Sequence, residues 1–250
     1  MDILQRQNGA IWHMKLNDIL YTESKRQMGQ YPFNMAEFKK ITDIRLQRHY
    51  LNNHAMFIGA GTSRIAYGIS PKWVIKLAGG ISFKTVVSSL GMVEAGAAQN
   101  EAEVENYAKA SENAKKLLPR TVAISPNNYN CILTELVRPV TGFEEMRQLV
   151  FGDHQIVGEH GVVQTMGGLL QIIAKAHGSD DEYMQEQLEA IQAISNPVVG
   201  EFIDSIVACA NELSLGLFDL RRAVQWGKSA DGRLVLLDFG GTEDVLDEYY

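Results

Sequence analysis

The chain has 250 residues, 46% of them hydrophobic and 21% charged, and a formal net charge of −7. These values are typical of a globular protein and exclude an intrinsically disordered chain. The negative charge argues against generic nucleic-acid binding, because no excess of Lys and Arg is available to neutralise phosphates. We expect no membrane association, since no apolar run approaches the roughly 18 residues that span a bilayer and the N-terminus lacks a signal-peptide pattern. Cys131 and Cys209 form no metal-ligand pair, which fits a reducing, cytoplasmic location.

The chain begins with a polar segment, residues 1–52, which we interpret as a helical N-terminal extension. Its pattern breaks near Pro32, and a second helix is predicted over Met35–Tyr50. Short runs rich in β-branched and aromatic residues follow, separated by Gly and Pro, and they predict antiparallel strands. These runs lie at residues 56–58, 65–69 and 73–77, and a second predicted hairpin uses 120–124 and 131–137.

A helix is predicted over residues 99–118, ending before Pro119. Together with the strands it defines a small sheet with one helix over residues 53–138. The remainder, 139–250, is predicted to be mostly helical, and its last strand is entered through a turn at Asp231-Gly232. The predicted helices of this part are 143–150, 161–177, 181–195 and 198–215, and the strand is 233–237.

A glycine-containing loop is the first pattern that carries candidate chemistry. Gly59 and Gly61 lie between two strand-like runs, where the backbone can approach a polyphosphate closely and successive amides can face its oxygens. Ser63 could contact phosphate or be autophosphorylated, although a turn serine is the simpler interpretation. A dinucleotide-binding loop is disfavoured, because a strand and not a helix follows. Taken alone, the loop also fits an ordinary hairpin turn.

A lysine in the third predicted strand is the second pattern. Alternation places Lys76 on the face opposite its apolar neighbours, where its ammonium could reach phosphates from under the glycine loop. A solvated lysine at a sheet edge is the alternative. The predicted helix 99–118 offers Glu101, Glu103 and Glu105 as ion-pair partners of Lys76. We favour Glu103 and interpret the other two as surface residues.

Two aspartates near the end of the chain form the third pattern. Asp219 lies in a loop, where a carboxylate can orient or deprotonate an attacking hydroxyl. Asp238 begins Asp238-Phe239-Gly240 directly after a buried strand, where it could hold Mg²⁺ against phosphates. Arg221 and Arg222 could hold an acidic substrate or a γ-phosphate, or one of them could pair with Asp219.

In this order, the patterns of residues 56–241 resemble the protein-kinase-like superfamily, which includes protein kinases and aminoglycoside phosphotransferases. The resemblance implies an α+β, two-lobed fold with ATP and Mg²⁺ in a cleft between a small antiparallel sheet and a reduced helical lobe. It assigns Asp219 to catalysis, Asp238 to the metal, and Lys76 with Glu103 to the ion pair. It also assigns Gly59 and Gly61 to the phosphate loop, and the backbone groups of Glu135 and Val137 to adenine.

The sequence departs from the family pattern at several positions. Arg64 stands where many kinases have a third glycine, and Val224 where a metal-binding Asn is expected. Gln225 could supply an amide oxygen to Mg²⁺ instead, if the loop is one residue longer. The run Gln225-Trp226-Gly227 resembles divergent phage and bacterial members. Because only residues 241–250 follow Gly240, we expect no activation segment and no control by its phosphorylation.

The expected function is transfer of the γ-phosphate of ATP to a hydroxyl. A protein Ser or Thr is favoured over a small molecule as the acceptor, because the sequence indicates no enclosed acceptor pocket. AMP transfer from ATP bound in a flipped orientation is one alternative. The other is a pseudokinase that binds a host or partner protein without catalysis. The resemblance to divergent members implies a phage setting. The sequence does not indicate the oligomeric state.

Overall fold

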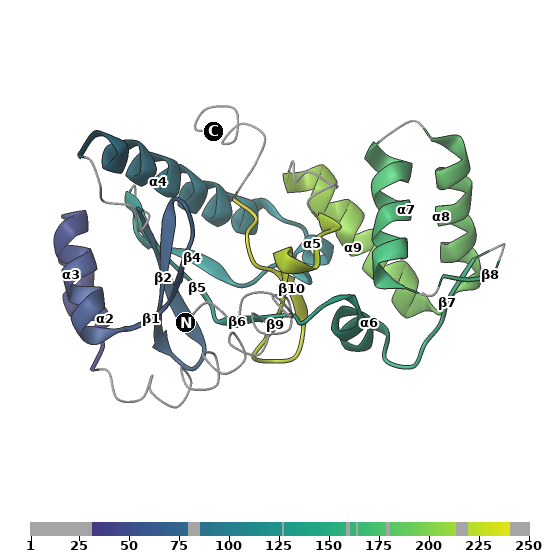
Figure 1. Cartoon of the computed structure of the whole chain (residues 1–250), viewed down its shortest axis with the longest axis horizontal. Coiled ribbons are helices and arrows are strands. Elements are labelled where there is room, and N and C mark those ends of the chain that lie inside the picture. The colour runs from purple at the N-terminus through teal and green to yellow at the C-terminus, as the bar shows by residue number, and fades with distance from the viewer. Residues whose placement is uncertain are drawn as a thin grey trace, which may run out of the picture. The chain divides into compact units, whose positions relative to one another are not determined.

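The structure is a computed structural model that describes residues 32–79, 86–126, 128–158, 161–163, 165–178, 181–213 and 220–240 (Figure 1). The fold is α+β, with a five-stranded antiparallel sheet and several helices, which confirms the predicted class. The chain divides into two compact units. The first holds the described residues up to Ala97 together with 123–138, and the second holds 98–122 and those from Pro139 onward. Asp219 and the extension before Pro32 lie outside the described residues.

Five strands build the main sheet, and its order across the sheet is β1-β2-β3-β5-β4. Their bounds are β1 Met56–Ala60, β2 Arg64–Ser70, β3 Trp73–Ala78, β4 Thr121–Ser125 and β5 Asn128–Glu135. The predicted strands and the second hairpin are therefore present. The predicted run 131–137 is divided at Leu136, whose side chain is buried and whose amide donates to the carbonyl of Lys72 at 2.8 Å. A short strand, β6 Val137–Pro139, follows.

The two faces of this sheet have different partners. Ile65, Tyr67, Ile75 and Leu77 point to one face and form a core with helices α2 Met35–Phe38 and α3 Ile44–His54. The other face carries Met56, Ile58, Ala66, Val74 and Leu136. Side chains alternate along a strand, so Lys76 lies on this second face, opposite Ala66 of β2 and Ile132 of β5. The alternation predicted for Lys76 matches the packing of its neighbours.

The single helix predicted over Met35–Tyr50 is wrong, because this segment forms two helices, each of which begins at its own capping residue. The carboxamide of Asn34 accepts from the amide of Ala36 at 2.9 Å and begins α2. The carboxylate of Asp43 accepts from the amide of Arg45 at 2.9 Å and begins α3. A side chain that accepts hydrogen bonds from the first helical amides fixes a helix start, so α3 is a separate helix.

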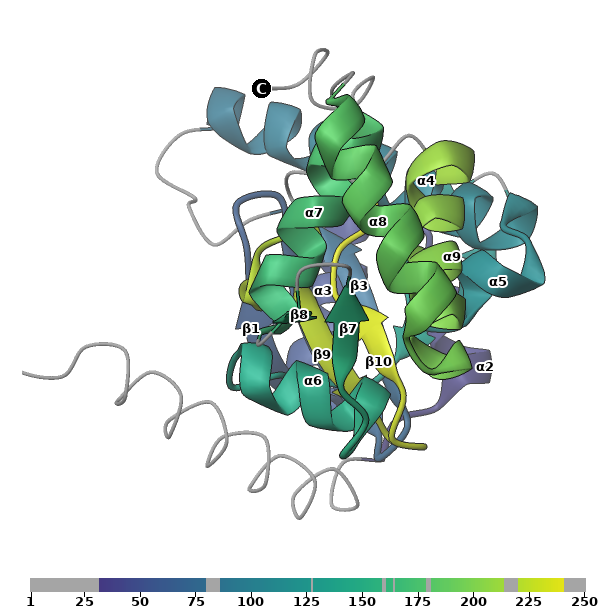
Figure 2. The ribbon, with the colours of Figure 1, turned by 90° about the vertical axis from the view of Figure 1, so that its right-hand side faces the viewer.

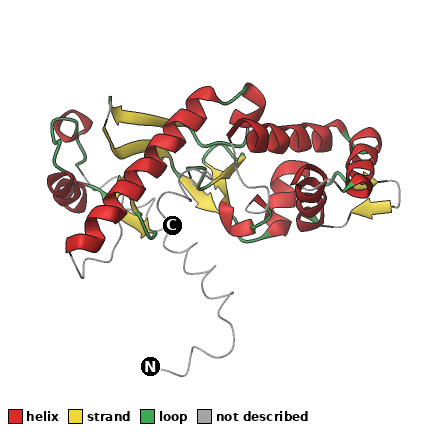
Figure 3. Cartoon of the chain, turned by 90° about the horizontal axis from the view of Figure 1, so that it is seen from above, coloured by secondary structure: helices red, strands yellow, loops and turns green. Residues whose placement is uncertain are grey.

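The helix predicted over 99–118 begins earlier and ends earlier than expected. Helix α4 spans Val86–Lys109 and is unbroken in Figure 3. A second short helix, α5 Glu112–Lys115, begins at Ser111, whose hydroxyl accepts from the amide of Ala114 at 3.3 Å. The carboxylate of Glu212 accepts from the amide of Ser111 at 2.7 Å and lies at the break between α4 and α5. Up to Ala97, α4 belongs to the first unit, and its remainder belongs to the second.

Four longer helices form most of the second unit, and α7 and α8 lie side by side (Figure 2). Their bounds are α6 Phe143–Phe151, α7 Met166–Gly178, α8 Glu182–Ile194 and α9 Pro197–Leu213. The predicted start of α7 at residue 161 is wrong, because a hairpin of β7 Ile156–Gly158 and β8 Gly161–Val163 precedes it. Gly161 has φ 116°, a conformation that favours glycine and permits this turn. Within the described residues, no helix is long and apolar enough to cross a bilayer.

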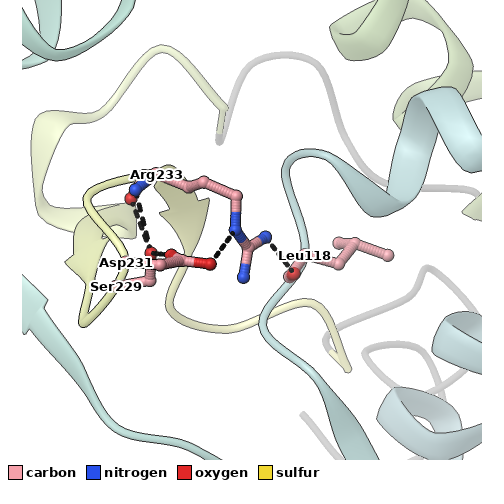
Figure 4. A network of polar contacts seen from close by, with 4 residues as sticks. All are labelled: Leu118, Ser229, Asp231 and Arg233. Atoms are coloured by element: carbon pink, nitrogen blue, oxygen red, sulfur yellow. Dashed lines mark hydrogen bonds and ion pairs between the residues drawn. The ribbon is translucent and has the colours of Figure 1, made fainter.

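A second hairpin in this unit precedes Asp238 of the third sequence pattern. It consists of the 3₁₀ turn η2 Ala223–Gln225 and the strands β9 Trp226–Ser229 and β10 Leu234–Leu236. Figure 4 shows the hydrogen bonds that fix its turn. Arg233 donates to the carboxylate of Asp231 at 2.9 Å and to the carbonyl of Leu118 at 3.4 Å. The hydroxyl of Ser229 also donates to Asp231, and together with Arg233 it lowers the pKa of that carboxyl to about 2.

Candidate functional site

The glycine loop forms the tight turn between β1 and β2. The amide of Gly61 donates to the carbonyl of Arg64 at 2.8 Å and closes the turn. Thr62 is exposed at its tip, whereas the side chain of Ser63 is only 5% exposed. The carbonyl of Ser63 accepts from the amide of Gly79 at 2.6 Å, which joins the loop to the end of β3. The loop is therefore held at its base and open at its tip.

Neither Gly59 nor Gly61 is required by the packing around the loop. A Cβ built on Gly59 would meet no atom within 4 Å, and one on Gly61 would lie 3.9 Å from the carbonyl oxygen of Arg64. Gly96 of α4 is the opposite case, since its Cβ would lie 2.2 Å from the oxygen of Ser63. Gly96 thus lets α4 touch the base of the loop. The two loop glycines leave space above the backbone that a ligand can approach.

The second face of the first unit's sheet combines apolar side chains with the ammonium of Lys76. Val74 and Leu136 are 5% and 1% exposed, and the small Ala66 lies opposite Lys76 in the neighbouring strand. Lys76 is half-buried, so its stem packs along the sheet. Apolar side chains next to a cation are a combination suited to an aromatic base that is linked to phosphates.

At the end of β5, the backbone groups of Glu135 do not bond to the neighbouring strand β3. Glu135 lies opposite Trp73, while the amide of the next residue, Leu136, donates to the carbonyl of Lys72. Hydrogen-bonded and non-hydrogen-bonded pairs alternate in an antiparallel ladder, so the N–H and C=O of Glu135 point away from β3. Val137 begins the next strand, β6. The contact of adenine with the backbone of Glu135 and Val137 stays a prediction.

The three glutamates proposed as partners of Lys76 differ in burial. Glu103 is fully buried, whereas Glu101 and Glu105 are exposed on α4. Buried carboxylates are found almost always in ion pairs or hydrogen-bonded networks, which distinguishes Glu103 from the other two. Lys76 belongs to the first unit and Glu103 to the second, and the ion pair between them stays a prediction.

Asp238-Phe239-Gly240 is held against the second half of α4. Phe239 is fully buried in the core of the second unit, and its carbonyl accepts from the carboxamide of Asn106 at 2.8 Å. Gly240 lies against the helix backbone, since its Cβ would be 2.2 Å from the oxygen of Gln99. Asp238 itself is exposed, and one of its oxygens lies 3.4 Å from the amide of Gly240. An accessible carboxylate thus projects from a fixed backbone.

Gln225 is hydrogen-bonded through its backbone to the residue that precedes Asp238. The carbonyl of Gln225 accepts from the amide of Leu237 at 2.8 Å. This bond continues the hairpin by one position beyond its last pair, Trp226 and Leu236. Val224, which occupies the position expected for a metal-binding Asn, is 67% exposed. Asp238 and Gln225 offer a carboxylate and an amide oxygen, the donors that Mg²⁺ prefers, so the residues fit this ion.

No group of three or more His, Cys, Asp and Glu residues that could hold a metal occurs in the described part of the chain. Mg²⁺ at nucleotide sites needs no such cluster, because one or two side chains share it with phosphates and waters. Assignment of Asp238 and Gln225 to Mg²⁺ stays a prediction.

Trp226 is hydrogen-bonded to the first described residue after Asp219. Its indole N–H donates to the carbonyl of Leu220, the residue after Asp219, at 2.7 Å, and its ring is fully buried. Arg221 is half-buried and Arg222 is exposed. This hydrogen bond was not predicted from the sequence. The place of Trp226 directly after Gln225 was the available signal.

Three further polar residues of α4 were not predicted to be part of the site. Gln99, Asn100 and Asn106 are buried together with Glu103, at 8%, 0%, 1% and 0% exposure. Gln99, Glu103 and Asn106 follow the spacing of one helix face, so they form a polar stripe. That spacing was readable in the sequence, but its burial was not, because polar residues on a helix are normally exposed.

No family model matches the chain, and no curated protein or solved structure is similar enough to count as a match. The function is therefore argued from the chemistry of the residues described above.

Proposed function

We propose that the chain is a protein-kinase-like, two-lobed phosphotransferase, which binds ATP and Mg²⁺ and moves the γ-phosphate to a hydroxyl. The arrangement of the β9–β10 hairpin carries the proposal. Its residue Gln225 is hydrogen-bonded to Leu237, which precedes the exposed Asp238, and its Trp226 is hydrogen-bonded to Leu220, which follows Asp219 in the sequence. Two aspartates and an amide are the groups that orient a hydroxyl and hold a metal in phosphoryl transfer.

The first unit supports the proposal with groups suited to the nucleotide. Its sheet offers an apolar face formed by Ala66, Val74 and Leu136, beside Lys76. The glycine loop leaves its backbone open at Gly59 and Gly61. We assign adenine to the apolar face and to the backbone of Glu135 and Val137, and the phosphates to the loop and Lys76.

Each proposed residue has a role in the transfer. The acceptor oxygen bonds to the γ-phosphorus, the bond to the β,γ-bridging oxygen breaks, and ADP leaves. Asp219 orients the acceptor hydroxyl and takes its proton, while Lys76, positioned by Glu103, neutralises phosphate charge. Asp238 and Gln225 hold Mg²⁺, which when bound adds further charge neutralisation. A protein Ser or Thr is the acceptor that we favour.

Labelled ATP tests the proposal. The full chain is incubated with Mg²⁺ and either γ- or α-labelled ATP, with and without a cell lysate. We expect label from the γ position only, and we expect Lys76→Met and Asp238→Asn to lose it. The matched controls are Lys72→Met and Asp153→Asn, because both residues are exposed and lie outside the proposed site.

The outcomes separate the alternatives. Label from the α position would identify an AMP transferase. Binding of ATP without transfer of either label would identify a pseudokinase that acts on a partner by binding. Full labelling by Asp219→Ala would contradict the assigned chemistry, and absence of both binding and labelling would overturn the proposal.

A further inference from the structure

The stretch of α4 that contacts Asp238-Phe239-Gly240 is polar, although it is buried. An apolar helix face is the usual way to pack against a core, since a buried amide is costly unless it is hydrogen-bonded. The carboxamide of Asn106 is 1% exposed and donates to the carbonyl of Phe239 at 2.8 Å, a residue 133 positions away in the sequence. This contact joins a helix to the backbone that carries the exposed carboxylate of Asp238.

The backbone around Asp238 is fixed on both sides of that residue. Before it, the amide of Leu236 donates to the carbonyl of Leu117, and the amide of Leu237 donates to the carbonyl of Gln225, both at 2.8 Å. After it, Asn106 holds Phe239, and Gly240 lies against the backbone of α4. Removal of the Asn106 donor loosens only the side after Asp238, at Phe239.

We infer that Asn106 is a positioning residue for the metal ligand Asp238, an inference that rests on the proposed function. Its carboxamide fixes the carbonyl of Phe239, and thereby the direction in which the Asp238 carboxylate projects. Side chains that orient a metal ligand from behind contribute to metal affinity without touching the metal. Asn106 therefore raises the affinity for ATP that carries Mg²⁺ and leaves the affinity for metal-free ATP unchanged.

The test compares ATP affinity in Mg²⁺ with that in EDTA by titration calorimetry on the full chain. For Asn106→Ala we expect a loss of about tenfold or more in Mg²⁺, the range seen for residues behind a metal ligand, and no change in EDTA. Glu105→Ala is the matched control, because Glu105 neighbours Asn106 on α4 and is exposed. If Asn106→Ala does not fold, Asn106→Leu replaces it, since leucine fills similar space without a donor.

The outcomes distinguish this inference from the proposed function. Wild-type protein that does not bind ATP more tightly in Mg²⁺ than in EDTA would overturn both. Wild-type protein with a strong Mg²⁺ effect that is retained in the Asn106 variants would overturn the positioning role alone. An equal loss in Mg²⁺ and in EDTA would also overturn it, because that pattern indicates a purely structural contribution.

Discussion

Gly240 lies so close to Gln99 that a Cβ on the glycine would come within 2.2 Å of the main-chain oxygen of that residue. Backbone cannot move aside as a flexible side chain can, so the Gly240→Ala variant must displace either α4 or the end of the hairpin. Overpacking of this kind costs about 1–3 kcal/mol, and we expect a loss of that size in the free energy of unfolding. Urea denaturation of the full chain measures it. An unchanged midpoint would show that the two segments are not in contact in solution.

The glycine loop should respond in the opposite way to the same substitution. A Cβ on Gly59 meets no atom within 4 Å, so Gly59→Ala should leave the midpoint of urea denaturation unchanged or slightly higher. ATP affinity should nevertheless fall, because the added methyl group occupies the space that we assign to the phosphates. Calorimetric titration with ATP and Mg²⁺ measures the change. Unaltered affinity would argue against phosphate binding at this loop.

Loss of the Trp226 hydrogen bond should affect transfer more than nucleotide binding. Trp226→Phe keeps an aromatic ring but leaves the buried carbonyl of Leu220 without its indole donor, which costs about 1–3 kcal/mol of stability. Because Leu220 follows Asp219, we expect the transfer rate to fall while the ATP affinity stays the same. Phe202→Leu, which alters a ring packed against Trp226, is the control for packing. Equal transfer rates in the two variants would remove the role of the hydrogen bond.

Acid should weaken the turn of the β9–β10 hairpin through Asp231. Hydrogen bonds from Ser229 and Arg233 lower the pKa of this carboxyl to about 2, below its ordinary value of 3.8. A lowered pKa in the folded state means that the ionised form stabilises the fold above pH 3.8, and that this contribution is lost as the pH falls toward 2.

Asp231→Asn should therefore be less stable than wild type at neutral pH, with a difference that shrinks as the pH falls through that window. The side chain is 49% exposed, so solvent screening makes the effect modest. Thermal unfolding of both proteins between pH 7 and pH 3 measures it. A difference that stays constant over this range would contradict the assignment.

Much of the fold could be predicted from the sequence because its signals are local. Alternating apolar residues gave β2 and β3 and also placed Lys76 on the face opposite Ile75 and Leu77. The division of the helix predicted over Met35–Tyr50 was missed, although Asp43 is a residue that commonly begins helices. The early start of α4 could not be predicted, because Gly96 weakens the helical pattern in the sequence. The reason for a glycine at this position is a tertiary contact, since a Cβ there would clash with the oxygen of Ser63.

The candidate site shows the same limit. Asp238 and Gln225 were selected from their order in the chain, and the structure adds a backbone hydrogen bond between Gln225 and Leu237, the residue before Asp238. Asn106 was not selected, since its partner lies 133 positions away and an asparagine on a helix usually faces water. Residues that touch a ligand leave a pattern in the sequence, whereas residues that orient them through tertiary contacts do not.

Helix α4 has a practical consequence for attempts to separate the two units. The second unit includes residues 98–122, which precede part of the first, so neither unit is one continuous stretch of chain. Cutting between Arg138 and Pro139 leaves Gln99 and Asn106 on the N-terminal fragment and Phe239 and Gly240 on the other. We expect the C-terminal fragment to be insoluble when it is produced alone, and the two fragments to be recovered together when they are produced in the same cell.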